Sequence, residues 1–368
     1  MVKPIKSSRW VFFKHTHSKR SSSSSTMSTM AEYRRLGKSG LRVSVPILGC
    51  MSFGDPRWNS WVLPEEKALP ILKAAWDAGV TTLDLANMYS NGESEIIVRN
   101  FINQYNIPRE NMVIITKIRF PVDHEQMSTI TSHMRFELAS TRDYVNQSGL
   151  SRTAIFNQTE ASLKRLGMDY IDVLMIHMYD METPFEETMR ALHDLVLSGK
   201  VRYLGASNVR AWQFIEMNNV AQLNGWTQFS CVQMEHSLLY RAEERELFAY
   251  CDFKGIGIIA FSPLMDGHLA RPDGTETVRT KRYKGSSYDK KRRESDIKII
   301  QRVEEIAQKH SWKMCQVALA WSASKISSPI VGVNSVERLH EDITTGKTLT
   351  AEEIKYLEEL YEDQPPRF

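Results

Sequence analysis

Four side chains that could act together in proton transfer stand at or just after the ends of short apolar runs of this sequence. Asp84 ends the run 81–84, and Tyr89 follows five residues later, ahead of a helical pattern that opens at Glu93. Lys117 ends the run 112–117, and His177 follows the run 171–176. Reduction of a carbonyl group requires a proton donor aimed at the developing alkoxide, and a tyrosine with charged neighbours can be that donor. The pattern therefore predicts a site for proton transfer, and carbonyl reduction is one reaction that would use it.

Each of the four residues is expected to have its own role. A free tyrosine has a pKa of about 10, and a nearby ammonium group lowers that pKa by favouring the phenolate. We expect Tyr89 to be the acid, Lys117 to lower its pKa, Asp84 to pair with Lys117, and His177 to orient the carbonyl oxygen. Taken singly, each also fits a structural role as a cap, a solvated strand end or a core histidine. Together, on the second, third and fourth strands, they favour the catalytic interpretation.

The elements that would position these residues alternate between strand and helix from residue 33 onward. The apolar runs show no period-2 alternation, as expected of parallel strands buried on both faces. They lie near residues 45–50, 81–84, 112–117, 171–176, 201–205, 230–234, 256–261 and 329–333. Helical patterns lie near 65–78, 93–105, 152–166, 184–198, 209–224, 241–252, 313–324 and 335–344. Eight such pairs predict an α/β fold, a (β/α)8 or TIM barrel, with an N-terminal β-hairpin over 34–44 and extra helices such as 350–361.

Two connections are long, and both belong to the loops after strands, which form the active face of such a barrel. Residues 118–150 follow the third strand, and residues 262–294 follow the seventh. The basic stretch 279–293 is either a solvated loop or a flap near cofactor phosphates. We divide the chain into a leader (1–30), one barrel domain (31–361) and a tail (362–368).

The composition is that of an ordinary globular protein, with 42% hydrophobic and 25% charged residues among 368. No apolar run approaches the roughly 18 residues that cross a membrane. Six Lys or Arg and no acid lie in the leader, so the rest of the chain carries a net negative charge and gives no reason to expect nucleic acid binding. Four scattered cysteines without a Cys-x-x-Cys pair predict neither disulfides nor a metal site.

The leader is basic, rich in serine and free of acids. It is either a disordered extension, with Met27 or Met30 as the true start, or a mitochondrial transit peptide. We expect a cytoplasmic protein in the first case and a mitochondrial one in the second.

Several segments resemble the aldo-keto reductase family, and the resemblance runs from about residue 33 to 361. The segment 35–44 (Arg-Leu-Gly-Lys-Ser-Gly-Leu-Arg-Val-Ser) is similar to that family's amino terminus, and the segments 48–54 and 161–172 are similar to others of its motifs. The segments 61–63 and 144–151 look most like fungal aryl-alcohol-dehydrogenase-type members. The resemblance implies that the four reactive residues are the family's catalytic tetrad. It also implies an NADP(H)-dependent enzyme that reduces aldehydes or ketones to alcohols.

The resemblance further implies which residues bind the cofactor. The nicotinamide carboxamide would be held by Ser207, Asn208 and Gln233, and the ring would stack on Phe261. The diphosphate would be covered by the loop of Ser262, Pro263 and Leu264, and the adenosine end would face Arg338, Glu341 and Asp342. The cofactor set also includes Met51 and Gly332. The substrate set is Trp58, Trp61, Tyr89 and His177. Aromatic walls favour an aromatic or extended apolar carbonyl substrate.

No Gly-x-Gly-x-x-Gly follows a strand, so a Rossmann site is not indicated. A barrel instead binds phosphates near its last two strands and a helix N-terminus, for which residues 334–337 offer a capping box. The family's frequent basic residue before this helix is replaced by Val333 and Asn334, and a cation from 279–293 could substitute. Leu85 stands where the family often has Thr.

Two other functions remain open from the sequence. One is a non-catalytic NADPH-binding regulatory or sensor subunit of the channel-associated type, since fold does not settle function. The other is a metal-dependent hydrolase, which the spacing of His and carboxylate residues does not support. We expect a small-molecule substrate as partner, and neither nucleic acid, membrane nor metal.

Overall fold

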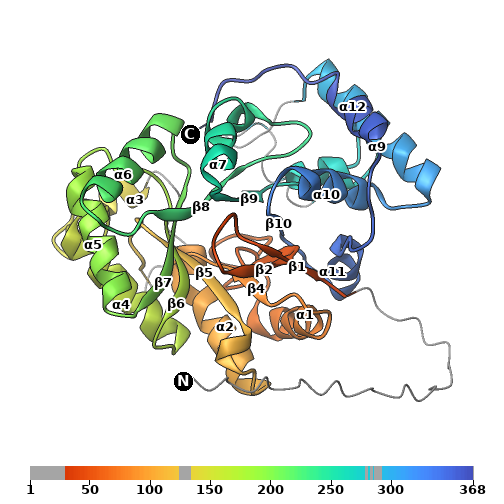
Figure 1. Cartoon of the computed structure of the whole chain (residues 1–368). Coiled ribbons are helices and arrows are strands. Elements are labelled where there is room, and N and C mark those ends of the chain that lie inside the picture. The colour runs from red at the N-terminus through yellow and green to blue at the C-terminus, as the bar shows by residue number, and fades with distance from the viewer. Residues whose placement is uncertain (1–29, 124–133, 278–280, 282–284, 286–291, 368) are drawn as a thin grey trace, which may run out of the picture.

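Eight short parallel strands form the centre of the computed structural model, which describes residues 30–123, 134–277, 281, 285 and 292–367 (Figure 1). In chain order they are β3 (Ile47–Gly49), β4 (Thr82–Asp84), β5 (Val113–Ile118), β6 (Ile171–Ile176), β7 (Val201–Ser207), β8 (Phe229–Glu235), β9 (Gly257–Phe261) and β10 (Ser328–Val331). Each pairs with the next, and β10 closes the ring by pairing with β3. The predicted (β/α)8 barrel is confirmed.

A ring of helices surrounds these strands (Figure 1). They are α1 (Glu65–Asp77), α2 (Glu93–Gln104), α4 (Arg152–Leu166), α5 (Phe185–Leu197), α6 (Ala211–Leu223), α7 (Leu247–Lys254), α10 (Met314–Lys325) and α11 (Val336–Asp342). The short 3-10 helices are η1 (Tyr89–Gly92), η2 (Arg109–Asn111), η3 (Ala242–Glu244) and η4 (Met265–Ala270). The helical pattern predicted over 241–252 divides into η3 and α7. Helix α11 begins after Ser335, whose side chain caps it, and not after Asn334.

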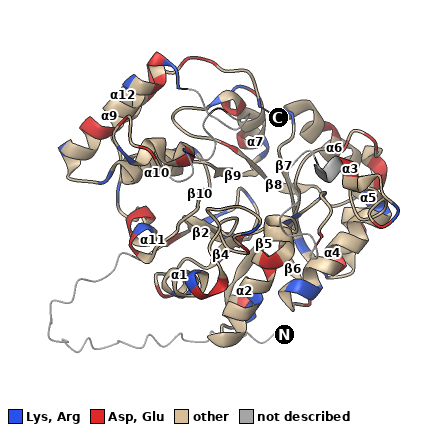
Figure 2. Ribbon diagram, turned by 180° about the vertical axis from the view of Figure 1, so that it is seen from behind, with Lys and Arg blue, Asp and Glu red and all other residues tan. Residues whose placement is uncertain are grey.

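Burial on both faces explains the continuous apolar strands. In β6 all six residues are buried. Val173 and Met175 join the cluster inside the barrel, while Leu174 and Ile176 pack outward against the helices. Figure 2 shows charged residues on the outer helices and few on the barrel strands.

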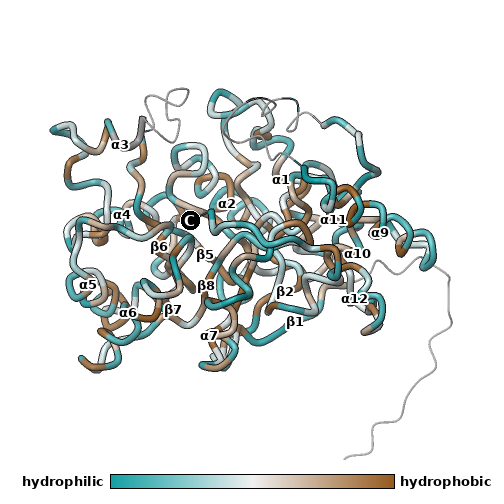
Figure 3. The backbone as a smooth tube through the Cα atoms, turned by 90° about the horizontal axis from the view of Figure 1, so that it is seen from above, coloured by the Kyte–Doolittle hydropathy of each residue, from teal (hydrophilic) through white to brown (hydrophobic). Residues whose placement is uncertain are grey.

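An antiparallel hairpin, β1 (Glu32–Arg35) and β2 (Arg42–Val45), closes the amino-terminal end of the barrel. Its Leu36 and Val43 are fully buried in the inner cluster. At the turn, Gly37 has a φ of 60°, and a Cβ there would lie 2.4 Å from the backbone nitrogen of Gly257. In Figure 3 the hairpin lies on one face of the barrel, and α3 (Met134–Ala139) in the loop after β5 lies on the opposite face. The described part of the loop after β5 therefore lies on the face opposite the hairpin.

One long helix is absent from the predicted set and corrects it. Helix α9 (Glu294–His310) follows the loop after β9 and packs on α10 and on α12 (Ala351–Glu358). Ile299, Ile300 and Val303 are fully buried along one face, which is the period-3.6 pattern of a helix. The prediction assumes one helix after each strand, and it misses α9 because α9 and α10 both lie between β9 and β10. No helix among the described residues is long and apolar enough to cross a membrane.

Candidate active site

The carboxyl ends of β4 and β5 bring three of the four predicted reactive residues into direct contact. Lys117 is fully buried, and its Nζ donates to both carboxylate oxygens of Asp84, at 2.9 and 2.8 Å. The same Nζ donates to the Leu85 carbonyl at 2.8 Å and lies 3.2 Å from the Tyr89 hydroxyl. Because Leu85 contributes its backbone oxygen, its side-chain identity does not affect this contact. The ammonium group therefore joins a carboxylate to a phenol in a buried site.

The protonation states follow from burial opposed by charge. Burial raises the pKa of Tyr89, and the neighbouring Lys117 ammonium acts in the opposite direction without reversing the shift. The net direction is thus upward, which corrects the sequence expectation that Lys117 sets a lowered value. Burial lowers the pKa of Lys117, but Asp84 and Tyr89 outweigh it and the net pKa is raised. Tyr89 is protonated and Lys117 charged at neutral pH.

His177 follows β6 and lies beside Tyr89, with ring centroids 5.9 Å apart in an edge-on arrangement. Its backbone nitrogen donates to Ile118 at 2.9 Å, which fixes it to the end of β5. Phe120 also contacts the imidazole edge-on, with ring centroids 5.4 Å apart. The four predicted residues are therefore brought together at one mouth of the barrel.

An apolar wall surrounds the Tyr89 side chain. Its members come from four loops. Three are buried, namely Ala86, Met88 and Phe120, and three are partly buried and pack against them, namely Met51, Trp58 and Met178. Trp61, which is predicted to touch the substrate, packs edge-on against Trp58 with centroids 6.0 Å apart. Phe120 and Met88 were not among the predicted residues, although Phe120 stands only three positions after Lys117.

The residues predicted to hold a carboxamide lie next to this cluster, on β7 and β8. Ser207 pairs with Gln233 in register, and Gln233 Nε2 donates to Asp84 at 2.7 Å. Ser207 Oγ and Asn208 Oδ1 are buried and have no hydrogen-bond partner among the described residues. Buried polar atoms without a partner are costly unless a ligand satisfies them. These donors and acceptors fit the carboxamide of a nicotinamide ring.

The turn after β9 has a strained backbone. Ser262, Met265 and Asp266 have φ of 56°, 46° and 54°, and Gly267 has 94°. Left-handed residues are uncommon outside glycine and concentrate at ligand sites. Within this turn the backbone N–H groups of Met265 and Gly267 donate to the carbonyls of Ser262 and Leu264, each at 2.9 Å. Phe261, predicted to stack on the nicotinamide, is the last residue of β9 and leads into this turn.

Two arginines approach each other at the predicted adenosine end. Arg338 is exposed on α11, and its Nη1 donates to Asn334 at 2.7 Å. Burial lowers the pKa of Arg271, and the charge of Arg338 lowers it further. Neither arginine forms an ion pair with a residue that the structure describes. Arg271 was missed in the sequence, because the substitute cation was sought in 279–293, most of which lies outside the described residues.

Two predicted acids lie near these arginines. Burial raises the pKa of the Asp342 carboxyl to about 7, opposed by a hydrogen bond from the Cys315 thiol and by the two arginines. Glu341 is half exposed and lies 3.9 Å from the Lys313 ammonium. Gly332, after β10, is exposed, and a Cβ added there would meet no heavy atom within 4 Å, so space is open beside it.

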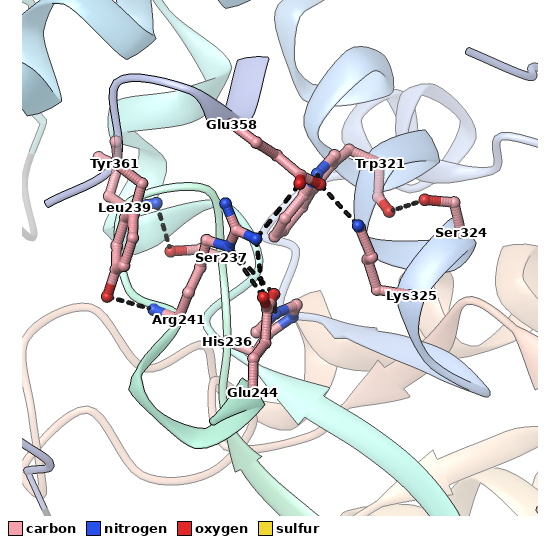
Figure 4. Close-up of polar contacts among 10 residues, drawn as sticks. All are labelled: His236, Ser237, Leu239, Arg241, Glu244, Trp321, Ser324, Lys325, Glu358 and Tyr361. Carbon is pink, nitrogen blue, oxygen red and sulfur yellow. Dashed lines mark hydrogen bonds and ion pairs between the residues drawn. The ribbon is translucent and has the colours of Figure 1, made fainter. Parts of the chain in front are cut away.

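A second polar cluster lies just beyond the end of β8 and is called here the helix-joining cluster (Figure 4). Its six members come from β8's end, η3, α10 and α12: His236, Arg241, Glu244, Trp321, Lys325 and Glu358. Glu358 accepts from Trp321 Nε1 at 2.7 Å and pairs with Lys325 at 2.7 Å and with Arg241 at 3.3 Å. Among the described residues, no group of three or more His, Cys, Asp or Glu could hold a metal ion.

Comparison with known proteins identifies the class to which this barrel belongs. A sequence model of the aldo/keto reductase family matches residues 47–362. An aldo-keto reductase of Fusarium vanettenii is 48% identical over 346 residues, which cover 92% of this chain and 93% of the relative. The versiconal hemiacetal acetate reductase of Aspergillus parasiticus is 48% identical over 335 residues, covering 90% and 97%. A Schizosaccharomyces pombe protein whose name places it among aryl-alcohol dehydrogenases is 46% identical over 343 residues, covering 89% and 95%.

These matches and the (β/α)8 barrel together define a carbonyl-reducing oxidoreductase. The chain belongs to the aldo/keto reductase family.

Proposed function

We propose that this protein reduces aromatic or extended apolar aldehydes and ketones to alcohols with NADPH, and that Tyr89 is the proton donor. The observation that carries the proposal is the buried contact of one ammonium group, on Lys117, with both the Asp84 carboxylate and the Tyr89 hydroxyl. Held by Ser207, Asn208 and Gln233, a reduced nicotinamide cofactor would supply the hydride that the carbonyl carbon needs. Tyr89 then protonates the oxygen that becomes the alcohol.

The other residues of the site prepare this proton transfer. Lys117 stabilises the phenolate that Tyr89 becomes, because a nearby cation favours the charged form. Asp84 holds Lys117 in place and keeps it charged. His177, edge-on to the tyrosine ring, donates to the carbonyl oxygen and orients it. The apolar wall around Tyr89 excludes water, which strengthens each of these charge interactions.

The adenosine end supports NADPH over NADH. Arg271 and Arg338 repel each other, and the nearby acids Glu341 and Asp342 offset this only in part, since neither arginine forms an ion pair with a described residue. A phosphate between the two arginines would relieve the remaining repulsion. Charge-assisted hydrogen bonds to a phosphate contribute about 1.5–3 kcal/mol each. The unpartnered atoms of Ser207 and Asn208 support the position of the nicotinamide end.

Two aromatic features support the substrate class. Trp58 and Phe120 flank Tyr89 and His177, and relatives include a protein named as an aryl-alcohol dehydrogenase. For the cell, we propose a cytoplasmic enzyme in which residues 1–30, mostly outside the described chain, are not needed for activity. Mitochondrial import of the tagged full-length chain would contradict that location.

The proposal is tested by steady-state oxidation of NADPH against a panel of carbonyl compounds. Benzaldehydes and extended aromatic ketones should turn over with higher kcat/KM than short aliphatic aldehydes of matched reactivity. Tight NADPH binding without turnover of any panel member would instead identify a regulatory subunit that senses the cofactor. Equal kcat/KM for aromatic and short aliphatic compounds would contradict the proposed preference for aromatic substrates but not the proposed carbonyl reduction.

A further inference from the structure

The backbone that carries Tyr89 adopts a conformation that side chains disfavour. Ser90 and Asn91 have φ of 48° and 51°, and Gly92 has φ of 90°. Three successive left-handed residues persist only where surrounding contacts over-determine them. The position of the Tyr89 hydroxyl therefore depends on what holds this loop.

Hydrogen bonds hold the loop on two sides. After Tyr89, Ser90 Oγ accepts from the backbone of Asp55 at 2.7 Å, which ties the loop to the segment after β3. Before Tyr89, Asn87 is almost fully buried and donates from its backbone to the Lys117 carbonyl at 3.0 Å. The Asn87 side-chain Nδ2 donates to the Phe120 carbonyl at 2.9 Å. Asn87 thus couples the tyrosine loop to the strand end that carries Lys117 and Phe120.

A second amide, on helix α4, completes this coupling. Gln158 Oε1 accepts from Asn87 Nδ2 at 3.1 Å and from the Arg119 backbone at 2.8 Å. Gln158 Nε2 donates to the carbonyls of Gly149 at 3.0 Å and Ala154 at 3.1 Å. All the hydrogen-bonding capacity of a primary amide is used in one buried position. One side chain therefore joins the tyrosine loop, the end of β5 and the end of the 118–150 loop.

Helix α4 provides a fixed base for this amide. Ser151 caps its first turn and Gly167 ends it, so Gln158 stands near the middle of a 15-residue helix. Side chains on regular elements hold geometry more accurately than side chains on loops. Neither Asn87 nor Gln158 touches the Asp84–Lys117–Tyr89 contact through its own side chain.

We infer that Asn87 and Gln158 act as a pair of positioning residues. Together they set the distances from the Tyr89 hydroxyl to the Lys117 ammonium and to the rings of Phe120 and His177. This inference rests on the proposed role of Tyr89 as proton donor. The pair acts through the backbone on both sides of the reacting groups. Misplacement of a reacting group by about 1 Å reduces rate by as much as a hundredfold.

The test compares four single variants and one double variant of the full chain. Gln158→Leu removes both halves of the amide, and Asn87→Ala removes its partner from the loop side. Thr159→Val is the matched control, because Thr159 is buried on the same helix and its hydroxyl bonds only within the helix, to the Ile155 carbonyl at 2.7 Å. Tyr89→Phe is measured in parallel. The readouts are kcat, the Kd for NADPH, and the primary isotope effect with NADPH deuterated at the transferred position.

Gln158→Leu and Asn87→Ala should each lower kcat by about tenfold to a hundredfold, with NADPH Kd changed less than about twofold. The isotope effect on kcat should rise, because the chemical step becomes slower than product release. The double variant should be no slower than the slower single variant, since residues acting as one unit are not additive. Thr159→Val should match the wild type in all three readouts. If Gln158→Leu does not fold, the positioning inference is tested by Asn87→Ala alone, whose kcat and isotope effect are compared with those of Thr159→Val.

Wild-type kcat in both amide variants beside an inactive Tyr89→Phe would overturn the positioning inference and leave the proposed function intact. Additive losses in the double variant, or an equal loss in Thr159→Val, would also overturn it. A fully active Tyr89→Phe would instead remove the proposed role of Tyr89, and the positioning role with it.

Discussion

Two polar clusters lie a few residues apart along β8, the first buried and the second mostly half-buried, and they are built on opposite plans. The first joins Asp84, Lys117 and Tyr89 to Gln233, and the second is the helix-joining cluster that begins at His236. In the second, Glu244 and Glu358 each have cationic partners, and only His236 Nδ1 lacks a hydrogen-bond partner among the described atoms. Beside the first, Ser207 Oγ, Asn208 Oδ1 and Trp58 Nε1 all lack one.

The difference teaches how a buried charge can be interpreted. When the chain itself supplies every counterion, the charge joins elements: Glu358 ties α12 to α10 and η3. When polar atoms around a charge lack partners and the backbone beside it is strained, the arrangement is prepared for a ligand. The two clusters should therefore respond to mutation in opposite ways, one in turnover and the other in stability.

The largest expected effect is in the first cluster. Lys117→Met removes the cation that opposes the upward pKa shift of Tyr89, and it also leaves the Asp84 carboxylate buried without a counterion. We expect kcat to fall by roughly 10²- to 10⁴-fold, the range attributed to general acid catalysis. Steady-state assays measure kcat, and thermal melting verifies that the variant is folded. A loss of less than about threefold would place Lys117 among purely structural residues.

The next effect belongs to the second cluster. Glu358→Ala leaves Trp321 Nε1 without its acceptor and removes an ion-pair partner of Arg241 and Lys325, which costs about 1–3 kcal/mol of unfolding free energy. Urea denaturation measures this, and kcat of the folded variant should stay within about twofold of the wild type. Glu359→Ala is the control, since that residue pairs only with Arg302 at the surface, a contact worth about 0–1 kcal/mol. A large fall in kcat without loss of stability would reverse the assignment of the two clusters.

Arg271 and Arg338, at the predicted adenosine end, are a third charged region to compare with the two clusters. Neither arginine forms an ion pair with a described residue. Arg338→Ala should weaken NADPH binding by roughly tenfold to a hundredfold, each tenfold being 1.4 kcal/mol. NADH, which has no 2′-phosphate, should bind almost as before. Arg271→Ala should have the same selectivity, and fluorescence titration gives all the Kd values. Equal Kd values for NADPH and NADH in the wild type would contradict a phosphate site here.

The smallest expected effect is one of pH. Reduction uses the protonated Tyr89, and burial raises its pKa above the ordinary value near 10. The protonated form therefore persists below that pKa, so kcat/KM for reduction should be flat between about pH 6 and pH 9 in this respect. It should fall only as the pH rises through the tyrosine pKa, while alcohol oxidation, which needs the phenolate, should rise. A fall in reduction between pH 7 and about pH 9 would show that Lys117 outweighs burial.

The helix-joining cluster has the opposite pH sensitivity, which affects stability. Burial opposes ionisation of Glu244, but hydrogen bonds from His236 and Arg241 outweigh it and lower its pKa to about 2. A carboxylate with a depressed folded-state pKa contributes stability above its unfolded pKa of about 4.5 and loses it as the pH falls toward the folded value. Acid should therefore weaken this tie and leave the proton chemistry of Tyr89 unchanged.

How much the sequence could predict differs between the same regions. The residues at the strand ends could be predicted because the carboxyl ends of parallel strands meet at one mouth of a barrel. Asp84, Lys117 and His177 could therefore be grouped from the sequence alone. The direction of the Tyr89 pKa shift could not be predicted from the sequence, because the burial of Tyr89 depends on how the loops assemble. Arg271 has no periodic or motif signal, since its position depends on the left-handed turn after β9. Helix α9 did carry a signal, in its apolar spacing, and was hidden by the assumption of one helix per strand.

The central claim is that the first cluster is a proton-donating site and not a structural tie. Tyr89→Phe tests it most directly, because the change removes one hydroxyl and keeps the packing of the ring. The account predicts that carbonyl reduction falls by at least about a hundredfold, while NADPH Kd and the unfolding midpoint stay close to the wild type. Undiminished turnover in a folded, NADPH-binding Tyr89→Phe protein would contradict it.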